Sequence, residues 1–124
     1  MESLAPNIFV KDLNQTISFY KQLGFTLITT VPEQGEYIWA MMNNGNVTMM
    51  FQTFDSLGTE LPSISRQDGG SLLFYIKVKD IRQLFEDVQK NATILKGLEK
   101  TFYGATEFSI LDNNNYVLTF AQDE

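Results

Sequence analysis

A short sequence occurs twice in this chain, and the repeat constrains the fold more than any other feature. Val10-Lys11-Asp12-Leu13 is followed 68 positions later by Val78-Lys79-Asp80-Ile81. Each copy ends an apolar run and begins a segment with helical spacing of apolar residues. The chain is therefore expected to contain two copies of one supersecondary unit.

The apolar spacing after each copy predicts a helix. In the first segment apolar residues recur at i, i+4 and i+7, which favours a helix over Leu13–Leu23 that ends at Gly24. The second segment predicts a helix over Ile81–Lys90. Asp12 and Asp80 stand where an N-cap side chain accepts unpaired backbone N–H groups.

A second pair of similar segments closes each half. Asn44-Gly45-Asn46-Val47 precedes an apolar run that ends at Gln52, and Asn114-Asn115-Tyr116-Val117 precedes one that ends at Gln122. Asn-Gly is a strong hairpin signal, and Asn115 can adopt the same left-handed conformation. Further strands are predicted over Thr26–Val31, Tyr37–Met42, Leu72–Val78, Thr93–Lys96 and Thr106–Leu111.

Each half thus has the order strand, helix and three strands. We expect one domain over residues 1–124, with repeat one at 5–52, a connection at 53–70 and repeat two at 71–122. The connection is longer than most loops, so it is either a linker or a segment that covers a binding site.

Composition excludes several classes of function. The chain has no cysteine and no histidine, so thiolate chemistry and imidazole metal ligands are ruled out. A net charge of −6 disfavours nucleic acid and mildly favours cationic ligands. No secretory leader is expected at the N-terminus, and no apolar run reaches the roughly 20 residues that span a bilayer. These features predict a cytoplasmic protein that binds neither nucleic acid nor membrane.

The sequence also resembles a known family at both ends. Phe9-Val10-Lys11-Asp12-Leu13, Ile17-Ser18-Phe19-Tyr20 and Leu23-Gly24-Phe25 are similar to the opening signature of the glyoxalase, bleomycin-resistance and dioxygenase (vicinal oxygen chelate) superfamily. Tyr103-Gly104, Glu107-Phe108 and Asp112-Asn113-Asn114-Asn115-Tyr116 resemble its closing signature, in which Asn113 replaces a common Pro and Asn115 a common Gly. Both replacements suit a turn.

This resemblance implies an α+β fold with two βαβββ repeats, whose curled mixed sheets form an open cup that is usually completed in a homodimer. It also implies four positions for metal ligands, occupied here by Ala5, Met49, Leu73 and Thr119. None of these side chains offers a charged or imidazole donor, so we expect no metal and no other cofactor. The metal-free, bleomycin-resistance-type branch of the superfamily is the most similar.

Strand alternation predicts which side chains face the cup. The side chains expected to contact a ligand are Phe9, Tyr37, Trp39, Met41, Met49, Tyr75, Glu107 and Thr119. Trp39 could instead be a core or dimer-interface residue, and the methionines could fill the core rather than an adaptable pocket wall.

Glu107 allows two interpretations. A carboxylate in an apolar cup would have a raised pKa and could transfer protons. Alternatively, Glu107 forms a salt bridge with Arg66 or Lys77, or is exposed at the rim. Because no paired base or metal accompanies it, no catalytic residue is assigned.

Two functions follow. The leading hypothesis is a metal-independent protein that binds a small molecule, with sequestration of a cationic aromatic compound as one form of that role. The alternative is a glyoxalase-like lyase or a dioxygenase-type enzyme with an atypical site.

Overall fold

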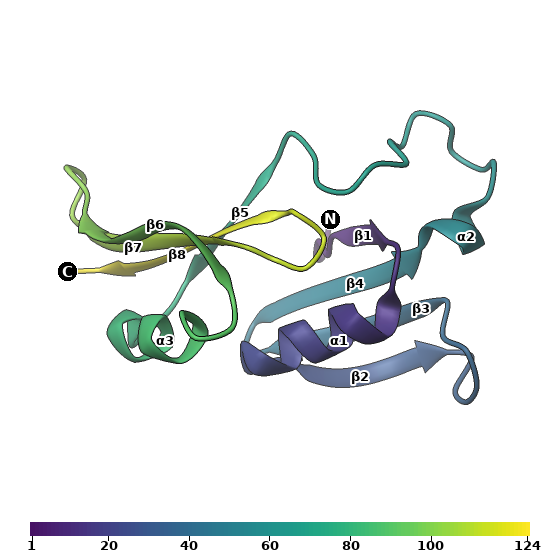
Figure 1. The fold of residues 1–124 in the computed structure, drawn as a ribbon, viewed down its shortest axis with the longest axis horizontal. Coiled ribbons are helices and arrows are strands. Elements are labelled where there is room, and N and C mark those ends of the chain that lie inside the picture. Colours follow the sequence, from purple (N-terminus) through teal and green to yellow (C-terminus); the bar gives the residue numbers. More distant parts are fainter. The chain divides into compact units, whose positions relative to one another are not determined.

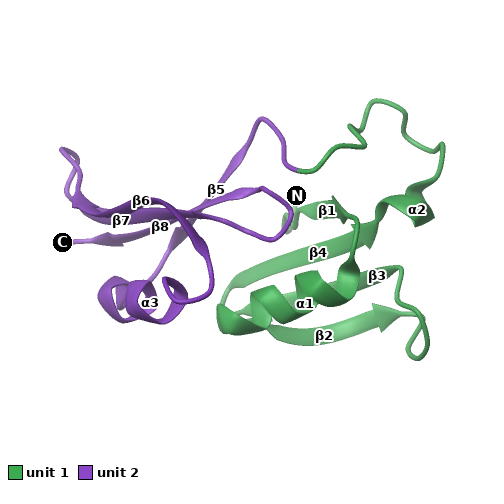
Figure 2. Cartoon of the chain, viewed as in Figure 1, with its two compact units in different colours: residues 1–68 green, residues 69–124 purple.

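The computed structural model describes residues 1–124, which divide into two compact units, residues 1–68 and 69–124 (Figure 2). Each unit consists of a four-stranded mixed sheet with a helix on one face (Figure 1). The predicted α+β fold with two βαβββ repeats is therefore confirmed. The assignment of residues 1–124 to a single domain stays a prediction.

In the first unit, β1 (Asn7–Val10) leads to α1 (Leu13–Gln22), followed by β2 (Thr26–Val31), β3 (Trp39–Asn44) and β4 (Val47–Thr53). The order in the sheet is β1-β4-β3-β2, with β1 parallel to β4 and the other pairs antiparallel. In the second unit the elements are β5 (Leu73–Lys77), α3 (Ile81–Val88), β6 (Thr93–Lys100), β7 (Ala105–Leu111) and β8 (Val117–Asp123). Their order, β5-β8-β7-β6, repeats that of the first sheet.

The helix ends form as their sequences predict. Asp12 Oδ1 accepts the N–H of Gln15 at 3.0 Å, and Asp80 Oδ1 accepts that of Gln83 at 3.3 Å. Gly24, at φ +92°, ends α1 with the two backbone hydrogen bonds of a Schellman motif. None of the three helices has the length and apolarity needed to span a membrane.

Aromatic side chains form the contacts between each helix and its sheet. The buried ring of Tyr20 on α1 lies 4.8 Å from Phe51 and 5.4 Å from Phe25, centroid to centroid. In the second unit, Phe108 lies 5.1 Å from Phe85 on α3 and 5.1 Å from Phe120. Alternate residues of each strand face these cores, which leaves the opposite face of each sheet, here called the open face, without a helix.

Several predicted elements differ from the structure in their bounds. The strand expected from Tyr37 begins at Trp39, because Tyr37 belongs to the loop that joins β2 to β3. The strand expected over Thr93–Lys96 continues to Lys100, because register irregularities let it pass Gly97 without ending. The connection includes a short helix, α2 (Phe54–Leu57), that the sequence did not predict.

A single arginine organises the rest of the connection. The guanidinium of Arg66 donates to the backbone carbonyls of Gly58, Glu60, Leu61 and Ile64, at 2.5–2.9 Å. These four hydrogen bonds fold residues 58–66 into a closed loop without a carboxylate partner. We call this segment the Arg66 loop.

Candidate functional site

The open face of the second sheet carries a polar cluster. Tyr75 lies opposite Thr119 on β8, which lies opposite Ser109 on β7. In the neighbouring row Lys77 is paired with Ala121 and then Glu107. Because side chains alternate along strands, all of these face the same side, opposite α3. The structure thus brings together the three ligand-contact residues predicted in this unit, Tyr75, Glu107 and Thr119.

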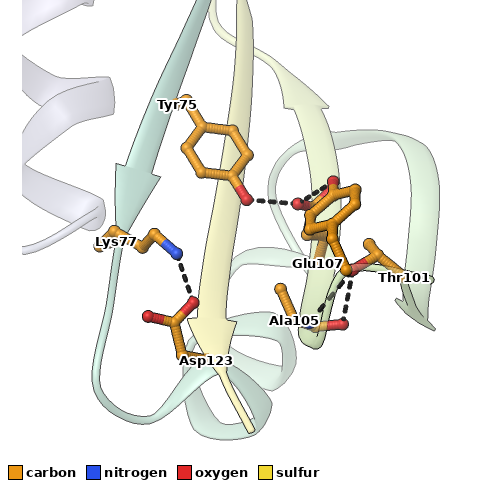
Figure 3. A network of polar contacts seen from close by, with 7 residues as sticks. Tyr75, Lys77, Thr101, Ala105, Glu107 and Asp123 are labelled. Atoms are coloured by element: carbon orange, nitrogen blue, oxygen red, sulfur yellow. Dashed lines mark hydrogen bonds and ion pairs between the residues drawn. The ribbon is translucent and has the colours of Figure 1, made fainter.

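Glu107 is the centre of this cluster. The hydroxyl groups of Tyr75 and Tyr103 both donate to the same carboxylate oxygen, Glu107 Oε2. Figure 3 shows the Tyr75 hydroxyl pointing across β8 toward Glu107. Tyr103 comes from the turn between β6 and β7, and its ring lies 5.1 Å from that of Phe102, which is fully exposed. We call Tyr75, Tyr103 and Glu107 the carboxylate–tyrosine cluster.

The cluster fixes the charge state of its members. Burial alone would raise the pKa of Glu107, but hydrogen bonds from Tyr103 and Tyr75 and the charges of Lys96 and Lys77 outweigh it, so the pKa lies below its ordinary value. The pKa of Tyr75 and that of Tyr103 are raised, chiefly because each hydroxyl donates to Glu107. Glu107 is therefore an anion and both tyrosines are neutral at pH 7.

Two expectations for Glu107 are thus wrong. A raised pKa would need an apolar setting, whereas two hydroxyl donors stabilise the ionised form. A salt bridge to Arg66 or Lys77 does not form either, since Arg66 bonds to carbonyls and Lys77 pairs with Asp123 (Figure 3). The nearby Lys96 pairs with Glu99 at 2.7 Å. No cation of the chain forms an ion pair with Glu107.

The hydroxyl groups beside the cluster satisfy each other. Ser109 Oγ and Thr119 Oγ1 are 2.8 Å apart in a buried hydrogen bond between β7 and β8. Thr119 is only 5% exposed, because it lies in the middle of the sheet. Thr119 therefore stabilises the pairing of β7 and β8 and exposes little of its side chain on the open face.

The open face of the first sheet is more apolar. Strand pairing aligns Trp39 with Gln52 and Gln52 with Phe9, and in the next row Met41 with Met50. The structure therefore brings Phe9, Trp39 and Met41 to one face, as predicted, and all three are half-buried. Tyr37 lies in the loop before β3, so strand alternation does not place its side chain on this face.

Two amides add polarity to this face. Asn7 Nδ2 donates to Gln52 Oε1 at 3.0 Å, and Gln52 in turn donates to Ser56. Asn7 Oδ1 is buried and accepts no hydrogen bond. A buried acceptor without a donor is costly, so this oxygen favours a ligand that brings an N–H or O–H group.

The prediction that Met49 faces the cup is wrong. Met49 is 2% exposed and pairs with the buried Met42, so it faces the helix-covered core. The physical reason is a difference between the hairpins. Two residues separate β3 from β4, whereas five separate β7 from β8. Aligning the two halves of the chain on their Asn-x-x-Val turns therefore places β4 one residue out of register with β8. A shift of one residue moves every side chain to the other face.

The strand pairing identifies Met50 as the counterpart of Thr119. Asn7 pairs with Met50 in the first sheet, as Tyr75 pairs with Thr119 in the second. The methionine pairs are divided accordingly: Met42 and Met49 fill the core, and Met41 and Met50 lie on the open face. The core-filling use considered from the sequence therefore applies to Met42 and Met49, and a place for Met41 in a pocket wall stays a prediction.

Sequence reasoning missed Tyr103 as a member of the cluster. Its position in a turn carries no strand alternation that could indicate its direction. A usable signal was its spacing of four residues from Glu107 across a hairpin turn, which lets the phenol reach back onto β7.

The side chains do not fit a divalent metal. No group of three or more carboxylate, imidazole or thiolate side chains comes together anywhere in the chain. The ligand positions implied by family resemblance offer Ala5, Leu73 and Thr119, with Met50 in place of Met49. One hydroxyl and one thioether are too few for the four or more donors that zinc, magnesium or calcium takes.

A model of the Glyoxalase/Bleomycin resistance protein/Dioxygenase superfamily matches residues 4–120. The chain belongs to this superfamily. No sequence among curated proteins is significantly similar to it.

Solved structures show the same fold at low sequence identity. TioX from Micromonospora sp. ML1 is 17% identical over 100% of both chains, with a TM-score of 0.79. A glyoxalase/bleomycin resistance protein/dioxygenase family enzyme from Burkholderia phytofirmans PsJN is 21% identical over 97% of both chains, with a TM-score of 0.79. A bleomycin resistance determinant encoded on the transposon Tn5 is 18% identical over 100% of this chain and 99% of its own, with a TM-score of 0.68.

Proposed function

We propose that this chain is a cytoplasmic, metal-independent protein that binds a small molecule and sequesters a cationic aromatic compound. The observation that carries the proposal is the donor set of the chain. Without histidine or cysteine, and without a carboxylate cluster, the superfamily's metal-dependent chemistry has no ligands to support it. Binding without a metal is the function that remains.

Both open faces favour a ligand that donates hydrogen bonds and carries positive charge. The second carries the ionised Glu107, and the first holds the buried, unpaired acceptor Asn7 Oδ1. The first face adds Trp39 and Phe9, whose rings can contact an aromatic or cationic group. The overall charge of −6 attracts such a ligand at long range.

Calorimetric titration against cationic glycopeptide and polycyclic antibiotics tests this proposal. We expect saturable binding that survives treatment with a chelator. Trp39→Phe should weaken it, whereas Ile28→Val, a change on the exposed edge strand β2, should not. Uniform absence of heat across the panel would defeat the sequestration role.

Elemental analysis of protein purified without chelator tests the enzyme alternative. A stoichiometric transition metal, together with turnover of a methylglyoxal–glutathione adduct, would establish a lyase and overturn the proposal. We expect neither.

We further propose that the protein is a homodimer. Each sheet ends in strands with an unpaired edge, β1 and β2 in the first and β5 and β6 in the second. Unpaired edges template further association and are usually covered. Light scattering at micromolar concentration should give twice the monomer mass of 14.2 kDa, and the monomer mass would contradict the proposal.

A further inference from the structure

The hydrogen bonds of the carboxylate–tyrosine cluster have a defined direction. Both phenolic protons point toward Glu107 Oε2, so each hydroxyl oxygen presents only its lone pairs to a ligand. Glu107 Oε1 accepts no hydrogen bond from the chain. The cluster therefore offers three acceptors and no donor: Glu107 Oε1, Tyr75 Oη and Tyr103 Oη.

These three acceptors are close together and accessible. Both hydroxyls bond to the same carboxylate oxygen, so the two phenolic oxygens and the carboxylate are immediate neighbours. Tyr75 is 46% exposed and Tyr103 57% exposed, and Glu107, which accepts both hydroxyl groups, is half-buried. Exposed apolar side chains border the cluster, Leu73 on β5 and Phe102 on the β6–β7 turn.

No cation of the chain forms an ion pair with the negative charge of Glu107. Lys77 is paired with Asp123 and Lys96 with Glu99, so both lysines act on Glu107 only at a distance and neither forms an ion pair with it. A phosphate or carboxylate ligand would meet a like charge at Glu107 and no hydrogen-bond donor from the cluster itself. A hard metal ion would find a single carboxylate, which is too few ligands.

We propose that the carboxylate–tyrosine cluster binds the primary ammonium group of an organic ligand. An R–NH₃⁺ group has three N–H donors, which match the three acceptors, and its charge is balanced by Glu107. The apolar part of the ligand then lies against Leu73 and Phe102. This inference rests on the proposed binding function and specifies the chemical group that the second unit recognises.

Three matched probes test the proposal by NMR titration of ¹⁵N-labelled protein: 2-phenylethylammonium, its N,N,N-trimethyl derivative and 2-phenylethanol. The trimethyl compound keeps the charge and ring but has no N–H, and the alcohol keeps the ring but has no charge. We expect saturable shifts for Glu107 and its neighbours with the primary ammonium, and at least about tenfold weaker binding of the other two probes, since charge-assisted hydrogen bonds are lost.

Variants locate the effect. Glu107→Gln should weaken the primary ammonium by about tenfold or more, because the charge is lost. Tyr75→Phe and Tyr103→Phe keep the rings and remove one acceptor each, so each should weaken binding by about two- to fivefold. Glu86→Gln, an equal change of charge on the exposed side of α3, is the control and should leave binding unchanged. Circular dichroism spectra confirm that each variant is folded.

Two results would overturn the proposal. Equal affinity for the primary and trimethyl probes would show that charge and ring contact, rather than the three acceptors, select the ligand, and the proposed binding function would stand. No saturable shift with the primary ammonium would remove the site, while the antibiotic titration judges the proposed function independently.

Discussion

Gly69 lies close to the backbone of Asn115 in the second unit, and this contact predicts a specific loss of stability. Gly69 has φ +79°, and a Cβ atom at this position would lie 2.8 Å from the backbone oxygen of Asn115. Asn115 has φ +64°, in the left-handed conformation its sequence position predicted. Replacing Gly69 with alanine therefore strains the backbone and also forces two turns apart.

Gly35 separates these two costs. It has φ +95°, but a Cβ atom there would meet nothing within 4 Å. Gly35→Ala should therefore lower the free energy of unfolding by about 1–2 kcal/mol, the cost of left-handed backbone for a residue with a Cβ. Gly69→Ala should lose this amount and a further ~1–3 kcal/mol for overpacking against a carbonyl that belongs to the main chain.

Urea denaturation followed by circular dichroism measures both variants. The extra loss in Gly69→Ala should leave the slope with denaturant unchanged, because the same surface is exposed on unfolding. The contact also lies beside the start of the β5–β8 pair, where Leu73 faces Val117. Losses that agree within about 0.5 kcal/mol would refute the reasoning, since the contact would then add nothing beyond the shared φ cost.

Three further predictions concern single side chains. Asp112 Oδ1 accepts the N–H groups of Asn114 at 2.8 Å and Tyr116 at 2.9 Å, so Asp112→Ala should cost about 2 kcal/mol in urea denaturation and Asp112→Asn less, and equal losses would contradict this. Because the pKa of Glu107 is lowered, its stabilising effect is complete above the ordinary glutamate pKa of about 4.3 and disappears as pH falls through the lower folded value. We compare the free energies of unfolding of wild type and Glu107→Gln at assay pH values from about 2 to about 7. The difference between the two should shrink only at the acidic end of this range. A difference independent of pH would refute the assignment. Arg66→Ala should speed proteolytic cleavage within residues 58–66 while the urea midpoint changes little, and unchanged cleavage would show that the Arg66 loop closes without its guanidinium.

Much of the fold was predictable because the sequence contains two copies of the same supersecondary unit. Helix caps and hairpin turns depend on a few neighbouring residues, so Asp12, Asp80, Gly24 and Asn115 could each be assigned from sequence. The repeat then fixed the order of elements. Strand ends were less predictable, because the continuation of β6 past Gly97 depends on its pairing with β7 rather than on its own composition.

The candidate site was predictable only where strands carry it. Alternation placed Tyr75 and Glu107 on one face, but it could not show that Tyr103 reaches back from a turn to the same carboxylate. Its hydrogen bond, together with that of Tyr75 and the charges of Lys96 and Lys77, gives Glu107 a lowered pKa where a raised one was expected. The prediction for Met49 was wrong for a different reason. Turn length sets the register of a hairpin, and the two turns have similar sequences but different lengths, so the sequence did not indicate the shift of one residue.

The Arg66 loop determines where the chain can be divided. All four carbonyls that hold the guanidinium precede Arg66, and the ion pair between Lys11 and Asp68, at 3.2 Å, also lies within residues 1–68. A fragment that ends at residue 68 therefore keeps every polar contact described for this segment. A fragment that ends at residue 57 lacks all of these hydrogen bonds and the ion pair. Split-protein reporters and circular permutants of this chain should accordingly be opened at the 68/69 junction, after the Arg66 loop has closed.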